Sequence, residues 1–289
     1  MEPLREKIGL KQGKEIAHMS HPQRLSFLAE GLPIIAGSAI NYWTVANSVK
    51  DQPREAEILA RNAEEEAAKA LILMDIVRCP PKRAAAHAGK LMGYFYSHLA
   101  RMIWADMCGA FVDTPAEIQH YVDMDRTSHY LDGPNDVDWV YTNRKLHRRE
   151  SQLYVDIESD DSGRLRWSCP DPGSAALIFE PAAVQAAKAL LELGAFSLEG
   201  LKTVSKIWAQ EYFELDSTTA TAKQFTEQTI AALIEAELPA ETATDDHVQA
   251  LYRSWPMPMY NIDFTLIAVN VADLRAEQEA WVPPDAFDH

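Results

Sequence analysis

The chain has 289 residues, 47% of them hydrophobic, and a formal net charge of −16 at pH 7. This composition supplies a sizeable apolar core and excludes disorder as the general state of the chain. An acidic surface repels phosphates and anionic lipid, which argues against non-specific coating of DNA or membranes. The three cysteines, Cys79, Cys108 and Cys169, form no CxxC pair, so neither a disulfide framework nor a cysteine-ligated zinc site is expected.

The first 20 residues mix charged and apolar side chains and lack the apolar run of a signal peptide. The longest apolar stretches stop well short of a membrane span, as where Asp75 interrupts the run from 70 to 77. We therefore expect a cytoplasmic protein without membrane contact, and a reducing cytoplasm also fits the cysteine usage.

Apolar residues recur at helical spacing through most of the chain. In the first half, Cys79-Pro80-Pro81 is a strong stop between two long helices. Asp51 is a plausible cap before Pro53, and Thr114-Pro115 opens a shorter helix. After an N-terminal helical arm (1–27), the predicted helices lie at about 33–49, 53–77, 82–111, from 114, and at 136–149.

One β-hairpin is predicted between the helical regions. Residues Gln152 to Glu158 alternate in polarity, 160–163 form a turn, and Leu165–Ser168 is the return strand. Beyond it, helices are predicted at about 181–193, 197–213, 218–237, 245–254 and 261–280, with a rigid break at Trp255-Pro256-Met257-Pro258. The sequence thus predicts a mainly α fold, divided into the arm, a helical domain with the hairpin (28–172) and a C-terminal helical region (173–289).

Two predicted helices carry the candidate catalytic residues. Glu65 and Lys69 lie four residues apart on one face, and His87 and Lys90 lie three apart, with Arg83 one turn earlier. If the two helices pack antiparallel, both polar faces enter one cleft. A histidine with a pKa near neutral can move a proton while cations hold a scissile phosphate, which suits RNA cleavage. The alternatives are an exposed ion pair and an ordinary surface histidine.

A basic cluster spans residues 144–149 in this acidic chain. Arg144, Arg148 and Arg149 could form a docking patch for phosphates. They could equally neutralise nearby acids such as Asp132, Asp136, Asp138 and Glu150.

Several motifs of other functional classes are missing from the sequence. It contains no GxGxxG, Walker loop, GxSxG or HExxH motif. No cofactor or metal site is therefore expected.

Three stretches in order resemble the AbiV-type abortive infection proteins of the HEPN superfamily. They are NAEEEAAKALILMDIV, HAGKLM and RRESQLYVDIE, followed by Trp167 and Pro170. The matching features are Glu65-x-x-x-Lys69, His87-x-x-Lys90 and Leu153-Tyr154-Val155-Asp156, and the resemblance covers roughly residues 28–172. The usual HEPN signature, Arg followed after four to six residues by His, is not met, because three residues separate Arg83 from His87.

The resemblance implies a HEPN-like helical bundle that serves antiphage defence by acting on RNA or the translation machinery. HEPN relatives are commonly metal-independent ribonucleases and often dimers. We therefore expect RNA or the ribosome as partner, a homodimer, and possible triggering by a phage-encoded protein.

Within that expectation, the residues take the following roles. His87 would transfer protons, Lys69, Lys90 and Arg83 would stabilise phosphate charge, and Glu65 would orient Lys69 or His87. Tyr154 and Asp156 would brace the site from the hairpin. Two other hypotheses remain open: a non-catalytic protein that blocks translation by docking to a ribosome or another partner, and a nucleotide-binding sensor.

Overall fold

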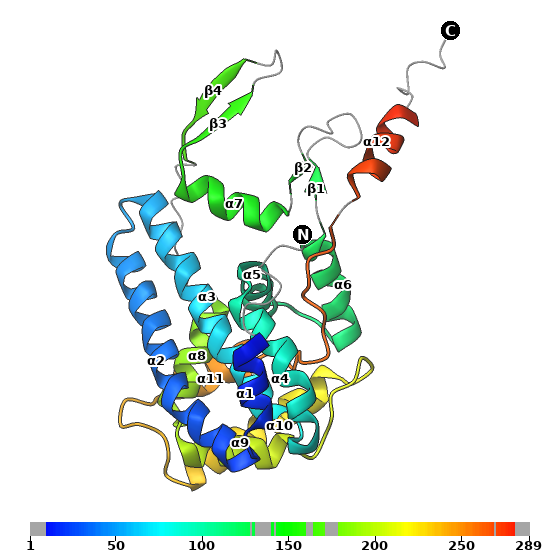
Figure 1. The fold of residues 1–289 in the computed structure, drawn as a ribbon. Helices are drawn as coiled ribbons and strands as arrows, with labels where there is room; N and C mark the ends of the chain where they lie inside the picture. The colour runs from blue at the N-terminus through cyan, green and yellow to red at the C-terminus, as the bar shows by residue number, and fades with distance from the viewer. Residues whose placement is uncertain are drawn as a thin grey trace.

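The structure is a computed structural model, and it describes residues 10–127, 129–130, 140–141, 143–159, 164–170, 179–268 and 270–280. Helices dominate it, and two short antiparallel hairpins lie between the helical regions (Figure 1). The predicted mainly α fold with an inserted hairpin is therefore confirmed. No helix in the described ranges combines the length and the apolar character needed to cross a membrane.

The elements follow one another along the chain in this order. The first helices are α1 (Leu10–His18), α2 (His21–Ser48), α3 (Pro53–Arg78), α4 (Pro81–Tyr96), α5 (His98–Met107) and α6 (Pro115–Arg126). The middle of the chain holds β1 (His129–Tyr130), β2 (Val140–Tyr141), α7 (Arg144–Leu153), β3 (Asp156–Ser159) and β4 (Leu165–Ser168). The last helices are α8 (Ala182–Glu192), α9 (Leu198–Trp208), α10 (Thr219–Glu235), α11 (Asp245–Ser254) and α12 (Val271–Ala280).

Helix α3 is the centre of the molecule and packs against α2, α4, α5 and α8. Every residue from Ala70 to Arg78 is buried, so this half of the helix is enclosed on all sides. One hydrophobic core runs from Ile16 in α1 to Phe264 near the C-terminus, and α2 passes residue 28 without a break. The N-terminal and C-terminal helices thus share the core of the central helices.

A buried ion pair joins α3 to the C-terminal segment. Asp75 binds Arg78 one turn later and accepts a hydrogen bond from the Met259 amide at 2.6 Å. Arg78 donates to the Pro256 carbonyl at 2.7 Å and packs against the rings of both Trp208 and Trp255. The polar residue that interrupts an apolar run in the sequence is therefore an anchor for a distant part of the chain.

The predicted helix over 82–111 is wrong in one respect, because it is two helices. Ser97 has an extended backbone conformation and separates α4 from α5. Its hydroxyl accepts a hydrogen bond from the Ala100 amide at 3.3 Å, which is the role of a helix N-cap. The break places His98 at the first position of α5.

Two other predicted helices differ from the structure. The helix predicted over 136–149 begins later, at Arg144, and Val140 and Tyr141 form a strand instead. The side chain of Asn143 caps this helix, α7. The helix predicted over 261–280 is confined to Val271–Ala280, because residues 255–267 form an irregular segment with a turn at 260–262, which is bonded to Asp75, Gln119 and Arg126. Residues 131–139 lie outside the described part of the chain.

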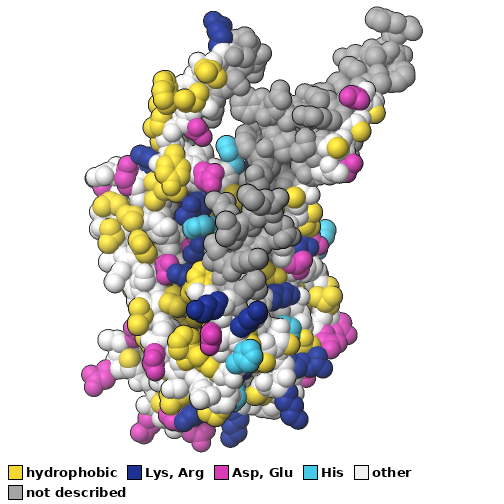
Figure 2. All heavy atoms as spheres, viewed as in Figure 1, with side chains coloured by type: hydrophobic (Ala, Val, Ile, Leu, Met, Phe, Trp, Pro, Cys, Tyr) yellow, Lys and Arg dark blue, Asp and Glu magenta, His cyan; other side chains and the backbone are white. Residues whose placement is uncertain are grey.

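The predicted hairpin is present as β3 and β4, with Ile157 opposite Trp167. Its first strand starts later than predicted because α7 continues to Leu153, and the predicted turn at 160–163 lies outside the described residues. Leu165 and Trp167 are 78% and 72% exposed, and they share a face of the hairpin with Ile157. Figure 2 shows this apolar surface on the upper left, where the hairpin projects from α7.

Candidate active site

Glu65, in the middle of α3, is a buried carboxylate with only 3% of its surface exposed. It accepts hydrogen bonds from His98 Nδ1 at 2.7 Å and from Arg149 Nε at 2.9 Å, and Arg101 Nη2 lies 3.3 Å from it. These donors come from α5 and α7. A buried charge needs such partners, so one side chain of α3 ties three helices together.

The partners determine the ionisation of Glu65. Burial alone raises the pKa of a carboxyl group, but the hydrogen bonds and charges of His98, Arg101 and Arg149 outweigh burial and lower the pKa of Glu65. The carboxylate is therefore ionised at neutral pH and acts only as an acceptor.

His98 presents its imidazole at the surface of this cluster, with 46% of the side chain exposed. Because ionised Glu65 can only accept, Nδ1 carries the proton of this hydrogen bond. The other nitrogen, Nε2, has no hydrogen-bond partner among the described residues, and in the neutral ring it is a base. A carboxylate that fixes the tautomer of a half-exposed histidine is the arrangement used in general acid–base catalysis.

Two guanidinium groups contact the carboxylate beside the imidazole. Arg101 Nη2 lies 2.9 Å from His98 Nδ1 and 3.3 Å from the same Glu65 oxygen that Nδ1 binds. Because a protonated Nδ1 cannot accept a hydrogen bond, Arg101 donates to the carboxylate and not to the ring. Arg149 binds the other oxygen of Glu65. Guanidinium groups match the geometry of phosphate oxygens and stabilise negative charge that develops on them. The cluster of Glu65, His98, Arg101 and Arg149 can therefore hold a phosphoryl group beside a base.

The register of α3 and α4 explains which histidine meets Glu65. Pro80 and Pro81 form the turn, so residues at similar distances from it along the two antiparallel helices face each other. Lys69, 11 residues before Pro80, reaches the ring of Phe95, 14 residues after Pro81, at 5.1 Å, and Glu65, one turn further from the prolines, reaches the start of α5. His87 is two turns back along α4, about 12 Å from the level of Phe95 at the rise of an α-helix.

The structure therefore divides the four predicted catalytic residues between two places. Glu65 belongs to the cluster with His98, and neighbouring Lys69 pairs with Glu66 at 2.7 Å. His87 and Lys90 instead face the C-terminal half of the chain. The expected single cleft that joins Glu65 to His87 is not formed, because the helical register separates them.

His87 lies in an aromatic seam. Its Nε2 is 3.0 Å from the Tyr212 hydroxyl, which donates to Asn261 Oδ1 at 2.8 Å, and its ring packs against Tyr260. Burial, with Lys90 and Arg83, lowers the pKa of His87, while the Tyr260 backbone opposes the shift. Lys90 donates to the Asn261 carbonyl at 3.2 Å. These contacts fasten α4 to the segments around 212 and 261.

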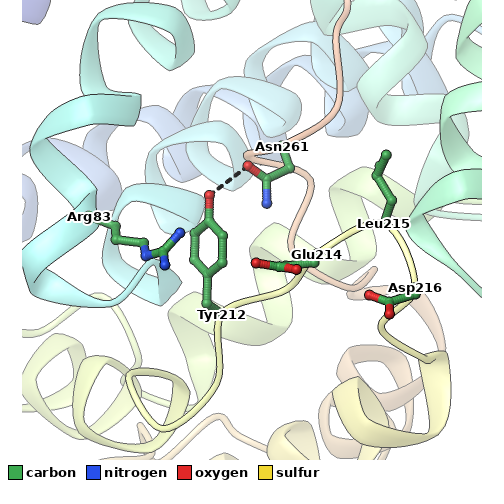
Figure 3. A pocket seen from close by; sticks show the side chains of 6 residues that line it. All are labelled: Arg83, Tyr212, Glu214, Leu215, Asp216 and Asn261. Atoms are coloured by element: carbon green, nitrogen blue, oxygen red, sulfur yellow. Dashed lines mark hydrogen bonds between the residues drawn. The ribbon is translucent and has the colours of Figure 1, made fainter.

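Beside this seam is an open cleft of about 590 Å³. Figure 3 shows Arg83 stacked on the ring of Tyr212, while Glu214, Leu215 and Asp216 line the opposite side. Arg83 lies 4.0 Å from the ring centre. The cleft combines one cation, Arg83, with the exposed carboxylates of Glu214 and Asp216, and this mixture of charges does not favour phosphate binding. Arg83 therefore lies away from the Glu65 cluster, beside two acids.

The basic cluster of α7 is largely neutralised by acids of the helical core. Lys145 binds Asp106 and lies 3.3 Å from Asp125, Arg148 lies 3.6 Å from Glu57, and Arg149 binds Glu65. Arg144 is exposed at the start of α7. Of the two interpretations that the sequence left open, neutralisation by acids accounts for Lys145, Arg148 and Arg149. The neutralising acids belong to α3, α5 and α6, and not to the sequence neighbours of the cluster.

The two residues expected to brace the site lie elsewhere. Tyr154 is exposed beyond the end of α7, and Asp156 opens β3, where it accepts a hydrogen bond from the Ile157 amide at 2.8 Å. Neither side chain forms a described hydrogen bond with Glu65, His98 or His87.

Sequence reasoning missed His98 and Arg101 as functional residues. Both residues lie in the first turn of α5, which the sequence pattern predicted as a continuation of α4. Without a predicted helix start at this point, neither residue was considered as part of a site. Counting residues from the Pro80-Pro81 turn pairs Glu65 with Tyr96, two residues before His98.

The described residues contain no group of three or more His, Cys, Asp or Glu side chains that could hold a metal ion. Comparison with known protein families, curated proteins and solved structures finds no match for the chain. A function can therefore be proposed only from the geometry of the site and from the sequence resemblance.

Proposed function

We propose that the chain is an endoribonuclease of antiphage defence, in which His98 transfers protons and Glu65 orients it. The observation that carries the proposal is the 2.7 Å contact between His98 Nδ1 and a buried Glu65 oxygen, with Nε2 left at the surface. This role passes from His87 to His98. Glu65 keeps the orienting role expected from the sequence, and Arg101 and Arg149 take the phosphate-stabilising role given there to Lys69 and Lys90.

The chemistry follows from the groups present. His98 Nε2 removes the proton of a ribose 2′-hydroxyl, and the 2′-oxygen attacks the adjacent phosphorus. The bond to the 5′-oxygen breaks, leaving a 2′,3′-cyclic phosphate, and the departing oxygen takes a proton from water. The hydroxide that remains takes the proton held by His98, which restores water and the neutral imidazole. Arg101 and Arg149 stabilise the additional negative charge of the pentacoordinate state.

The biological setting of the proposal comes from the resemblance to AbiV-type proteins. RNA, free or in the ribosome, is the substrate, a phage-encoded protein is the trigger, and the chain works as a homodimer in the cytoplasm. The cluster of arginines around Glu65 supports RNA as substrate, since the acidic remainder of the surface does not attract it.

Cleavage of labelled RNA by the wild type and by His98→Ala tests the proposal. We expect the variant to lose at least about a hundredfold in rate, the usual contribution of a general acid–base residue. His120→Ala, a change at an exposed histidine of α6, is the matched control and should keep the wild-type rate. Equal rates for wild type and His98→Ala would contradict the proposal, as would a wild type that cleaves no RNA.

A second candidate function is non-catalytic docking to the ribosome or another translation factor. The exposed apolar face of the β3–β4 hairpin, with Leu165 and Trp167, favours it. Under this alternative, ribosomes would co-sediment with the wild type without scission of their RNA, and Trp167→Ser would abolish co-sedimentation. His98→Ala would have no effect on it.

A further inference from the structure

A small pocket of about 190 Å³ lies between α3 and α7, directly beside Glu65. Ile58 and Leu153 form its apolar walls, and its polar lining consists of Arg61, Asn62, Glu65, Arg149 and Gln152. Pockets for drug-sized ligands start at roughly 300 Å³. This pocket therefore has room for a compact chemical group and not for a large molecule.

Gln152, which lines the pocket, carries a hydrogen-bond donor without an acceptor. The residue is 2% exposed, and its Oε1 accepts a hydrogen bond from Arg61 Nε at 3.1 Å, which fixes the orientation of the amide. Its main-chain carbonyl accepts from Arg54 Nε at 2.9 Å. The amide nitrogen Nε2 is buried and has no hydrogen-bond partner. A buried donor without a partner is costly, so an occupant with an acceptor oxygen would be favoured here.

The charges around the pocket specify the kind of acceptor. Arg61 and Arg149 line it, and Arg149 uses Nε for Glu65, so its two Nη atoms remain for another acceptor within the described contacts. Among the residues that line the pocket there are two guanidinium groups, Arg61 and Arg149, and one carboxylate, Glu65. The local excess of guanidinium groups favours an anion.

We propose that this pocket binds a phosphate group, with Gln152 Nε2, Asn62, Arg61 and Arg149 as its donors. Several donors on residues that line one compact site match the several acceptor oxygens of a phosphate better than the two of a carboxylate. In the ribonuclease proposed above, on which this further role rests, the pocket would hold a phosphate next to the scissile one. Phosphate binding itself does not depend on cleavage.

Calorimetric titration of the full chain with inorganic phosphate at constant ionic strength tests the site. Gln152→Glu keeps an acceptor for Arg61 but replaces the free donor with a carboxylate oxygen, so we expect at least a tenfold loss of phosphate affinity. Asn62→Ala should weaken binding with little effect on folding, and it decides the question if Gln152→Glu does not fold. Arg83→Ala, a change in the other cleft, should leave the affinity unchanged.

Competition experiments identify the source of the phosphate. Displacement by an unphosphorylated RNA oligonucleotide would assign the pocket to a backbone phosphodiester, and displacement by a nucleoside monophosphate alone would assign it to a terminal phosphate. Acetate that binds as tightly as phosphate would overturn the proposal. So would wild-type and Gln152→Glu chains of equal phosphate affinity, or a wild type that binds no phosphate.

The two proposals can fail separately. Phosphate binding that depends on Gln152, in a chain that cleaves no RNA, supports the pocket and contradicts the ribonuclease. Cleavage that depends on His98, with no phosphate bound in the pocket, contradicts only the pocket.

Discussion

Glu65 connects α3, α5 and α7 through the two oxygens of one carboxylate. Removing its charge leaves Arg101 and Arg149 partly buried with a weaker acceptor, and it frees the imidazole of His98 to rotate. Hydrogen bonds to charged groups contribute about 1.5–3 kcal/mol each, but His98 and Arg149 are partly exposed and solvent screens their share. The stability of the three-helix junction and the orientation of His98 thus depend on the same group.

Glu65→Gln should lower the free energy of unfolding by about 1–3 kcal/mol at neutral pH. The pKa of Glu65 is lowered in the folded state, so its stabilising effect is complete above the ordinary value of 4.5 and is lost as the pH falls through the lowered folded value. Urea unfolding of both chains in a series from neutral to acidic pH measures this difference. A gap between the two chains that does not change with pH would contradict the assignment.

Helix α7 is held on the bundle mainly by polar contacts. Arg54 donates to the Gln152 carbonyl at 2.9 Å and to the Leu153 carbonyl at 3.3 Å, groups that have no partner within the last turn of α7. Gln152 is the only buried residue of this helix. Arg54 therefore helps to fix the C-terminal turn of α7, which carries Gln152 and Leu153 of the phosphate pocket.

Arg54→Ala should loosen the C-terminal turn of α7 and leave the core intact. We expect faster amide hydrogen exchange in α7 and β3, with a loss of about 1 kcal/mol in global stability. Lys202→Ala, which removes an exposed ion pair with Glu199 on α9, is the control and should change neither. Exchange in α7 that matches the wild type would contradict this role of Arg54.

Helical spacing was sufficient to predict the long elements, because α3, α8, α10 and α11 carry local signals such as capping residues and proline stops. It could not predict the break at Ser97, since a serine within an apolar-periodic run is compatible with a continuous helix. Glu65 was recognised from its sequence surroundings, but its partners were not. His98 and Arg149 lie 33 and 84 residues away in sequence, and only the packing register of the helices brings them together.

At the scale of the whole molecule, the Asp75–Arg78 pair joins the central helix to the last part of the core. Both side chains are fully buried, and burial raises the pKa of Asp75 against the opposing effect of Arg78. Replacing both members of such a buried pair with apolar residues often changes the stability little, but removing one member leaves an unpaired buried charge and destabilises the fold. The segment over 255–264 is bonded to α3 through this pair, at Pro256 and Met259.

Arg78→Met should destabilise the fold by about 3–5 kcal/mol, because Asp75 loses its partner in a dry environment. The double change Arg78→Met with Asp75→Asn should recover part of the loss, since no lone charge remains. Chemical denaturation of the three chains measures both effects. A double variant less stable than Arg78→Met would contradict the explanation.

We propose that the imidazole of His98, held by Glu65, moves the proton during RNA cleavage, and that the imidazole of His87 in the aromatic seam does not. Single-turnover cleavage rates of His98→Ala and His87→Ala, measured together on one labelled RNA with folding checked by circular dichroism, test it most directly. We predict that His98→Ala loses about a hundredfold or more, while His87→Ala stays within a few-fold of the wild type. A large loss of rate in His87→Ala, with a rate close to the wild type in His98→Ala, would contradict this assignment and give the catalytic role to His87.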